Sequence, residues 1–349
     1  MTMRFGYWSP LNGGWLRNIP DENTPATFEH IKAIALEAEA SGFDVTLVPE
    51  LNLNDQKGMP SPRLDAWTVA AGLAAVTQSI EIMAAVRPGF HLPAIAAKQA
   101  ATIDEISGGR FSLNVVSAWW AEEARQYGGI FAEHDERYRR TEEFVAVLRG
   151  LWSETPFSFD GSFYQFDGTY AEPKPLHRPT IYAGGESEAG RDSISRFADA
   201  YVTHGGTVDE IREKIADLGR RRDLHGRPPL ETVGMAAFAI VRDTEADARA
   251  ELARITEVQP GPSFASFTEF VEKSELDLEI TLKDYSVSNR GLRPGLVGTT
   301  EAVADTIVEF EKAGLGLLLL QFSPNLPELK RFAADVIPLV RQREEQLGL

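Results

Sequence analysis

Apolar and polar positions follow a repeating order along this chain: a short apolar run, then a longer segment with one apolar face. Residues 4–9 form the first apolar run, and in residues 27–41 the apolar side chains recur at the spacing of one helix face. Seven more such pairs follow, with predicted strands at 44–50, 80–88, 110–119, 180–185, 200–205, 233–243 and 315–324 and predicted helices at 65–76, 93–106, 137–151, 189–198, 208–222, 246–255 and 328–347. The apolar runs are continuous, as in parallel strands that are covered on both faces. Eight strand–helix units predict an α/β fold, a (β/α)8 TIM barrel, with the doubly wound open sheet as the alternative.

Two segments interrupt this order. Residues 157–168 alternate apolar and polar side chains around Asp160 and Gly161, which predicts a β-hairpin insertion. Residues 259–294 lack periodicity and include the polar stretch DYSVSNRGLRPG, which predicts a second insertion that acts as an active-site lid. Because no linker-like or repetitive tract divides the chain, we expect one domain spanning residues 1–349.

Composition and charge remove several classes of chemistry. The sequence contains no cysteine, which excludes disulfides, thiolate catalysis and cysteine-bound metals. Its six histidines are dispersed without the spacing of metal ligands, so we expect no metal site. A net charge of −17 argues against a nucleic-acid partner. Neither a signal-peptide pattern nor an apolar run of about 20 residues is present, which predicts a cytoplasmic protein without a membrane segment.

The stretch TIYAGGESEAGRDSISR, residues 180–196, carries the clearest local signal for a binding site. An apolar strand ends at Gly184 and Gly185, and Ser187 precedes a helical segment in the position of an N-cap. A glycine turn that opens into a helix N-terminus can bind an anion through its backbone N–H groups. The stretch matches neither the G-x-x-x-x-G-K-[ST] nor the G-x-G-x-x-G pattern, so the anion is not identified by a motif.

Functional side chains of a (β/α)8 barrel lie at the carboxyl ends of its strands. The predicted ends carry aromatic rings, amides and charged groups, which suits a flat aromatic cofactor and a polar substrate. These residues are Trp8, Glu50, Asn52, Asn54, Arg87, Trp119, Trp120, His204, Phe238 and Gln321. We expect four of them to bind substrate, namely Trp8, Asn52, Asn54 and Gln321. We expect His204 and Trp119 to serve catalysis.

Two of these assignments have alternatives. His204 also fits a purely structural residue at a strand end, and Trp119 also fits a packing role. Because neighbouring side chains on a strand point to opposite faces, at most one of Trp119 and Trp120 should line the site.

Several long motifs resemble one known family. The segments AAKQAATIDEISGGRFSLNVVSAWW, HDERYRRTEEFVAVLRGLW, YAGGESEAGRD and LVGTTEAVADTI are similar to the bacterial-luciferase-like flavin monooxygenases, in the branch of alkanesulfonate, dimethylsulfone and pyrimidine oxygenases. The likeness runs from about residue 3 to about residue 340. It implies a barrel that binds FMN at its carboxyl end and uses FMNH2 and O2. It also implies a homodimer or homotetramer, and a separate NAD(P)H-dependent flavin reductase as partner.

The resemblance also implies which residues hold the cofactor. The FMN phosphate would lie at Gly184, Gly185 and Ser187. Arg137 and Tyr138 would lie beside the ribityl chain or phosphate, and Asn114 would contact the flavin. The remaining implied contacts are Pro49, Glu50 and Glu123, with Glu122 as the alternative to Glu123.

The substrate is less determined, because the sequence departs from its relatives at the site. Alkanesulfonate monooxygenase has an arginine and a histidine on its seventh strand, where this chain has Ala236 and Phe238, a pair that looks more like the dimethylsulfone enzyme. Yet Arg290 and Arg293 in the predicted lid suit an anion, and we expect them to act as a catalytic clamp on the substrate.

This combination favours a polar organosulfonate, such as the sulfo-sugar sulfoquinovose, which would be desulfonated with release of sulfite. The alternatives are dimethylsulfone or another neutral substrate of the same family, including a pyrimidine. A deazaflavin-dependent reductase and a flavin- or sugar-binding protein without catalysis also stay open.

Overall fold

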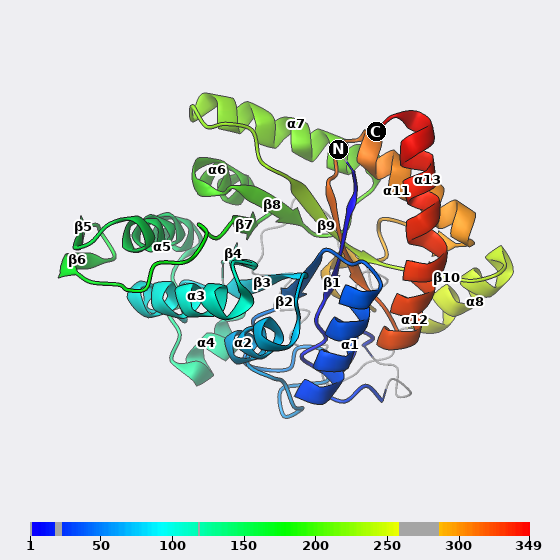
Figure 1. The fold of residues 1–349 in the computed structure, drawn as a ribbon, viewed down its shortest axis with the longest axis horizontal. Helices are drawn as coiled ribbons and strands as arrows, with labels where there is room; N and C mark the ends of the chain where they lie inside the picture. The colour runs from blue at the N-terminus through cyan, green and yellow to red at the C-terminus, as the bar shows by residue number, and fades with distance from the viewer. Residues whose placement is uncertain (1, 18–22, 118, 258–285) are drawn as a thin grey trace.

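The computed structural model describes residues 2–17, 23–117, 119–257 and 286–349. Its strands form a closed barrel in the order β1-β12-β9-β8-β7-β4-β3-β2, and every neighbouring pair is parallel (Figure 1). The eight barrel strands are β1 (Arg4–Trp8), β2 (Val45–Val48), β3 (Glu81–Val86), β4 (Phe111–Val116), β7 (Ile181–Gly184), β8 (Ala200–Thr203), β9 (Val233–Phe238) and β12 (Leu317–Gln321). The predicted (β/α)8 barrel is confirmed.

Helices pack around the outside of this barrel, as Figure 1 shows. They are α1 (Phe28–Ala40), α2 (Ala66–Val76), α3 (Pro93–Ser107), α5 (His134–Ser153), α6 (Glu188–Phe197), α7 (Val208–Leu224), α8 (Glu245–Ile255), α11 (Thr300–Lys312), α12 (Asn325–Arg331) and α13 (Ile337–Leu347), the last two joined by the π-helical turn η2 (Phe332–Val336). Many begin where a side chain caps the backbone, as Ser187 does for α6 and Thr207 for α7. No helix among the described residues is long and apolar enough to cross a membrane.

The strand alternation divides the core into two parts. In β12, Leu318 and Leu320 pack with the surrounding helices, whereas Leu317 and Leu319 belong to a cluster made of barrel strands alone. The second cluster is therefore the inside of the barrel, and Gln321, in step with Leu319, also points inward. The same alternation turns Asn114 of β4 inward, because its neighbours Leu113 and Val115 pack against the helices.

Two differences from the sequence-based predictions stand out. A helix not predicted, α4 (Ala121–Tyr127), lies between β4 and α5. The strand predicted at 233–243 is broken at Ala239, and its second part, β10 (Ile240–Val241), pairs outside the barrel with β11 (Val297–Gly298). The predicted hairpin is confirmed as β5 (Phe157–Asp160) and β6 (Gln165–Thr169), which project beyond α5 in Figure 1.

The predicted lid at 259–294 is described only from residue 286 onward, so residues 259–285 lie outside the described residues. The described part crosses the carboxyl end of the barrel. Arg17 N–H donates to the Ser286 carbonyl at 3.0 Å, and Gly205 N–H donates to the Asn289 carbonyl at 2.8 Å. Phe238 N–H donates to the Gly291 carbonyl at 2.7 Å. These bonds hold η1 (Ser288–Arg290) over the ends of β8 and β9.

Candidate functional site

The turn between β7 and α6 forms a recess at the N-terminus of α6, which we call the α6 cradle (Gly184, Gly185, Ser187, Gly190 and Tyr138). The Ser187 hydroxyl accepts the Gly190 N–H at 3.1 Å and lies 3.2 Å from the Tyr138 hydroxyl. A Cβ on Gly190 would stand 2.7 Å from the Tyr138 oxygen, so only glycine leaves this space open. Two hydroxyls and a helix N-terminus therefore converge on one point, as an anion requires.

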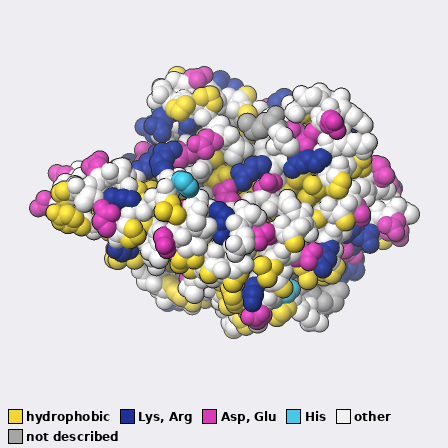
Figure 2. Space-filling view, viewed as in Figure 1, with side chains coloured by type: hydrophobic (Ala, Val, Ile, Leu, Met, Phe, Trp, Pro, Cys, Tyr) yellow, Lys and Arg dark blue, Asp and Glu magenta, His cyan; other side chains and the backbone are white. Residues whose placement is uncertain are grey.

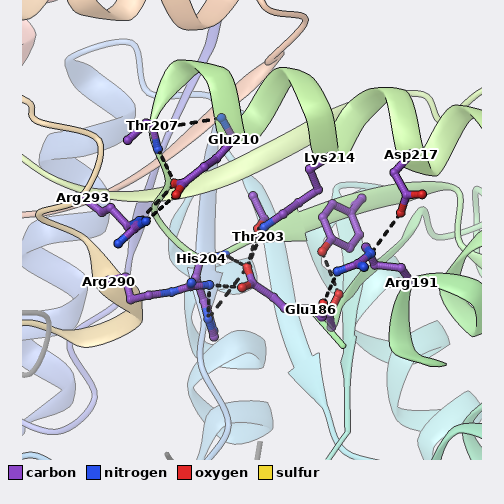
Figure 3. A network of polar contacts seen from close by, with 12 residues as sticks. Glu186, Arg191, Thr203, His204, Thr207, Glu210, Lys214, Asp217, Arg290 and Arg293 are labelled. Atoms are coloured by element: carbon purple, nitrogen blue, oxygen red, sulfur yellow. Dashed lines mark hydrogen bonds and ion pairs between the residues drawn. The ribbon is translucent and has the colours of Figure 1, made fainter. Parts of the chain in front are cut away.

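Beside this cradle, the Glu186 carboxylate binds four groups, which Figure 3 shows. It accepts hydrogen bonds from Lys214 Nζ at 2.9 Å, from the Thr203 hydroxyl at 2.6 Å and from the His204 backbone N–H at 3.1 Å. The guanidinium of Arg290 forms an ion pair with its second oxygen. These five residues, which we call the Glu186 cluster, come from the turn after β7, the end of β8, α7 and the described part of the predicted lid.

Electrostatics within the Glu186 cluster follow from burial. Burial, followed by the positive charge of the nearby Arg191, lowers the pKa of Lys214 to about 8. Burial, followed by Lys214, lowers the pKa of His204 to about 4, so this imidazole is neutral at pH 7. Its Nδ1 lies 3.3 Å from Arg290 Nη2 and can accept a hydrogen bond from it only in the neutral form.

Further ion pairs surround the cluster. Arg293 pairs with Glu210 of α7, and this contact lowers the pKa of the carboxyl group. Arg191 Nε donates to Asp217 at 3.0 Å, and its Nη1 donates to the Glu186 carbonyl (Figure 3). The two arginines predicted to clamp a substrate are thus each bound to a glutamate.

A second buried cluster lies at the ends of β2 and β3. Arg87, only 2% exposed, donates to both oxygens of Glu123, at 2.5 and 2.9 Å, and its backbone N–H donates to Glu50 at 2.8 Å. Glu50 Oε1 lies 2.5 Å from His91 Nε2. The predicted cofactor contacts Glu50 and Glu123 are therefore brought together, but by an arginine that they share. Pro49 also lies here, and its carbonyl accepts from Arg63 at 3.4 Å.

Two inward-facing amides have unpaired atoms at the carboxyl end of the barrel. Gln321 is 0% exposed, and neither its Oε1 nor its Nε2 has a hydrogen-bond partner among the described residues. The Asn114 side-chain oxygen, in a residue 4% exposed, likewise has none in the described part of the chain. The Trp8 indole N–H, at the end of β1, is another buried group without a partner among the described residues. Buried polar groups are costly unless paired, so these atoms mark positions where a ligand would complete the site.

The remaining predicted residues lie near the same end. Asn54 donates to the carbonyls of Asn12 and Pro62 and accepts two backbone N–H groups, so its amide serves its own loop. The Asn52 backbone N–H donates to Glu123, and the Arg137 guanidinium lies 4.9 Å from the Phe131 ring.

The arrangement of the tryptophan pair differs from the prediction. β4 ends at Val116, and Trp119 and Trp120 follow it instead of forming part of the strand. Their rings stack at 5.5 Å with an angle of 5° between the planes. The prediction that they point to opposite faces is wrong, because strand alternation no longer applies beyond β4.

A cavity of about 400 Å³ opens at the amino-terminal end of the barrel, away from the groups described above. Its wall includes Arg4, Glu81, Ser112 and Tyr182, which bond to one another: Arg4 donates to Glu81 at 2.6 Å and to Tyr182 at 3.2 Å, and Ser112 donates to Glu81 at 2.5 Å. This end of a (β/α)8 barrel is usually a source of stability. We therefore place the site at the opposite end.

Several residues of the site were missed by reasoning from the sequence: Glu186, Arg191, Lys214 and Glu210. Glu186 lies inside the quoted GGES motif, but nothing local marks its carboxylate as the partner of a lysine on α7. Asn114, Tyr138, Ser187, His204 and Gln321, which were predicted, lie at the same end of the barrel as these groups.

Comparison with known proteins connects this geometry to a family. A family model described as luciferase-like monooxygenase matches residues 3–316. The FMNH2-dependent dimethylsulfone monooxygenase of Pseudomonas putida is 36% identical, with 99% of this chain and 97% of the relative covered. The enzyme of the same name from Pseudomonas fluorescens (strain Pf0-1) is 34% identical, with 98% and 96% covered.

Solved structures agree on the fold. A long-chain alkane monooxygenase matches with a TM-score of 0.84 at 18% identity, with 98% of this chain and 92% of that chain covered. The resemblance seen in the sequence is confirmed over most of its length. This chain belongs to the luciferase-like monooxygenase family.

Proposed function

We propose that this protein is an FMNH2- and O2-dependent monooxygenase that acts on a small neutral sulfone such as dimethylsulfone. The two relatives above, matched over almost their whole length, carry that activity in their names. Their similarity favours the neutral-substrate alternative over the polar organosulfonate or sulfo-sugar that the sequence suggested. It also favours FMN over a deazaflavin, and a separate flavin reductase as the source of FMNH2.

The residues at the carboxyl end of the barrel fit FMN. The phosphate would take the α6 cradle, where Gly190 leaves space beside Tyr138 and Ser187. Asn114 lies on β4, which pairs with β7 up to Val116 and Gly184, so its unpaired oxygen lies on the cradle side of the barrel. A flavin ring carries N–H groups that can donate a hydrogen bond to this oxygen.

The ion pairs of Arg290 and Arg293 are the observation that most strongly supports a neutral substrate. Arg290 is 5% exposed and paired with Glu186, and Arg293 is paired with Glu210. A sulfonate would have to replace a carboxylate that already neutralises each guanidinium. The inner positions of β9, Ala236 and Phe238, are buried and apolar, so they add no positive charge. A sulfone needs hydrogen-bond donors but no countercharge.

FMNH2, when bound, would supply the electrons with which one atom of O2 enters the substrate. The protein would hold its phosphate at α6, orient its ring with Asn114 and exclude water. The apolar cluster of Trp15, Phe238 and Val287, against which Trp8 packs, would form the surface that excludes water from the site. With His204 neutral and Arg290 bound to Glu186, no described group of the Glu186 cluster would present an unpaired charge to the substrate.

A substrate panel tests this proposal. The purified protein would receive FMNH2 from a flavin reductase, together with dimethylsulfone, methanesulfonate, sulfoquinovose or uracil. We expect O2 uptake, formaldehyde and methanesulfinate with dimethylsulfone, and no sulfite from the two sulfonates. Release of sulfite from a sulfonate, with no product from dimethylsulfone, would reverse the choice of substrate. Turnover only with a reduced deazaflavin in place of FMNH2 would reject the cofactor.

A further inference from the structure

We infer that Gln321 and Trp8 form a pair of neutral N–H donors that bind the two oxygens of the sulfonyl group. This inference rests on the proposed function and names the residues that would select its substrate. Gln321 Nε2 and Trp8 Nε1 are both buried and have no partner among the described residues.

The two side chains lie on neighbouring strands at the same height. The register of β1 and β12 ends with Tyr7 opposite Leu320, so Trp8 and Gln321 come next on the two strands. Both alternate with residues that face the helices, and they therefore point into the barrel. On the other side of Gln321, Phe238 is its register partner in β9. The two N–H donors therefore lie side by side, next to the apolar side chain of Phe238.

The cofactor and the substrate would take opposite sides of the barrel. Asn114 belongs to β4 and Gln321 to β12, and four steps separate these strands in either direction around the ring of eight. β4 adjoins β7 and the α6 cradle, so the Asn114 side is the side of the cofactor. Gln321 lies on the opposite side, where the substrate would bind.

Gly291, in the described part of the predicted lid, keeps the space beside Gln321 open. A Cβ on Gly291 would lie 3.2 Å from Gln321 Oε1 and 3.1 Å from the Phe238 Cβ. Glycine at this position therefore lets the segment pass over β9 without crowding the glutamine amide. The two donors carry no charge, which matches a sulfone and gives a sulfonate no advantage.

Two variants that remove one donor each test the inference. Gln321→Met removes the amide but keeps the length of the side chain. Trp8→Phe removes the indole N–H, keeps an aromatic ring and leaves β12 unchanged. One neutral hydrogen bond corresponds to about a fivefold change in affinity. We expect KM for dimethylsulfone to rise about fivefold in each variant and about 25-fold in the double variant. Gln165→Met, on the exposed hairpin strand β6, is the matched control and should keep the wild-type KM.

A binding experiment gives a second readout without turnover. The indole N–H signal of Trp8, assigned by its loss in Trp8→Phe, should shift when dimethylsulfone is added to the protein loaded with oxidised FMN. FMN affinity should change less than about twofold in either variant, since neither donor is on the cofactor side. If the wild type neither binds nor oxidises any sulfone, the proposed function and this inference both fail. If it oxidises dimethylsulfone while both variants keep its KM and the Trp8 signal stays in place, only the donor pair is wrong.

Discussion

Changing Glu186 to glutamine should destabilise the protein and yet tighten its binding of FMN. The carboxylate side chain is 9% exposed, and its partners Arg290 and Lys214 are 5% and 15% exposed. Glutamine keeps the size of the side chain and can still accept from Thr203, but it leaves two buried cations without their countercharge. Breaking a buried ion pair from one side costs about 3–5 kcal/mol.

We take the lower figure, because glutamine retains part of the hydrogen bonding. A loss of about 3 kcal/mol corresponds to a fall in Tm of roughly 4 °C for a protein of this size. The same change removes one negative charge from beside the α6 cradle. At about 0.5–1 kcal/mol for a partly screened charge, the affinity for the FMN phosphate should rise about two- to fivefold.

Thermal melting of the apoprotein and titration with FMN measure the two effects separately. Glu210→Gln is the matched control, because Glu210 and Arg293 are 29% and 26% exposed and solvent screens their ion pair. Glutamine there can still accept the Thr207 N–H, so we expect a change in Tm below about 2 °C. A Glu186→Gln protein that melts within about 1 °C of the wild type and binds FMN equally well would refute the reasoning.

Three further predictions concern the same end of the barrel. Ser187→Ala should weaken FMN binding by about 1 kcal/mol through the lost hydroxyl, measured by FMN titration, and equal affinity would remove Ser187 from the site. Gly190→Ala should lower FMN affinity about tenfold in the same titration, because its Cβ would stand 2.7 Å from the Tyr138 oxygen and displace that hydroxyl from the α6 cradle; unchanged affinity would argue against the cradle as the phosphate site. The pKa of Lys214 lies near 8, below its ordinary value, so its positive charge is present below that pH and lost above it. FMN affinity, measured by titration at several pH values, should therefore fall between about pH 7 and about pH 9.5. The Lys214→Met variant should not show this fall.

Local periodicity was enough to predict the barrel and its hairpin. The spacing of apolar residues reports which face of an element is buried, and this depends on neighbours a few positions apart. The α6 cradle could be predicted for the same reason, since Ser187 caps the N–H of Gly190 only three residues later. The break at Ala239 was missed because residues 233–243 include one continuous apolar run across that residue. Such a run does not reveal that its first part pairs with β12 and its second part with β11.

The ion pairs of the site were decided by the tertiary structure alone. Glu186 and Arg290 are 104 positions apart, and Arg87 and Glu123 are 36 apart. With 35 basic and 52 acidic residues in the chain, no local rule selects these partners. The sequence therefore presented Arg290 and Arg293 as free to bind an anion, whereas the barrel places a glutamate against each. Closing eight strands into a ring brings distant side chains to one edge, and that closure determines which charges meet and which polar atoms stay unpaired.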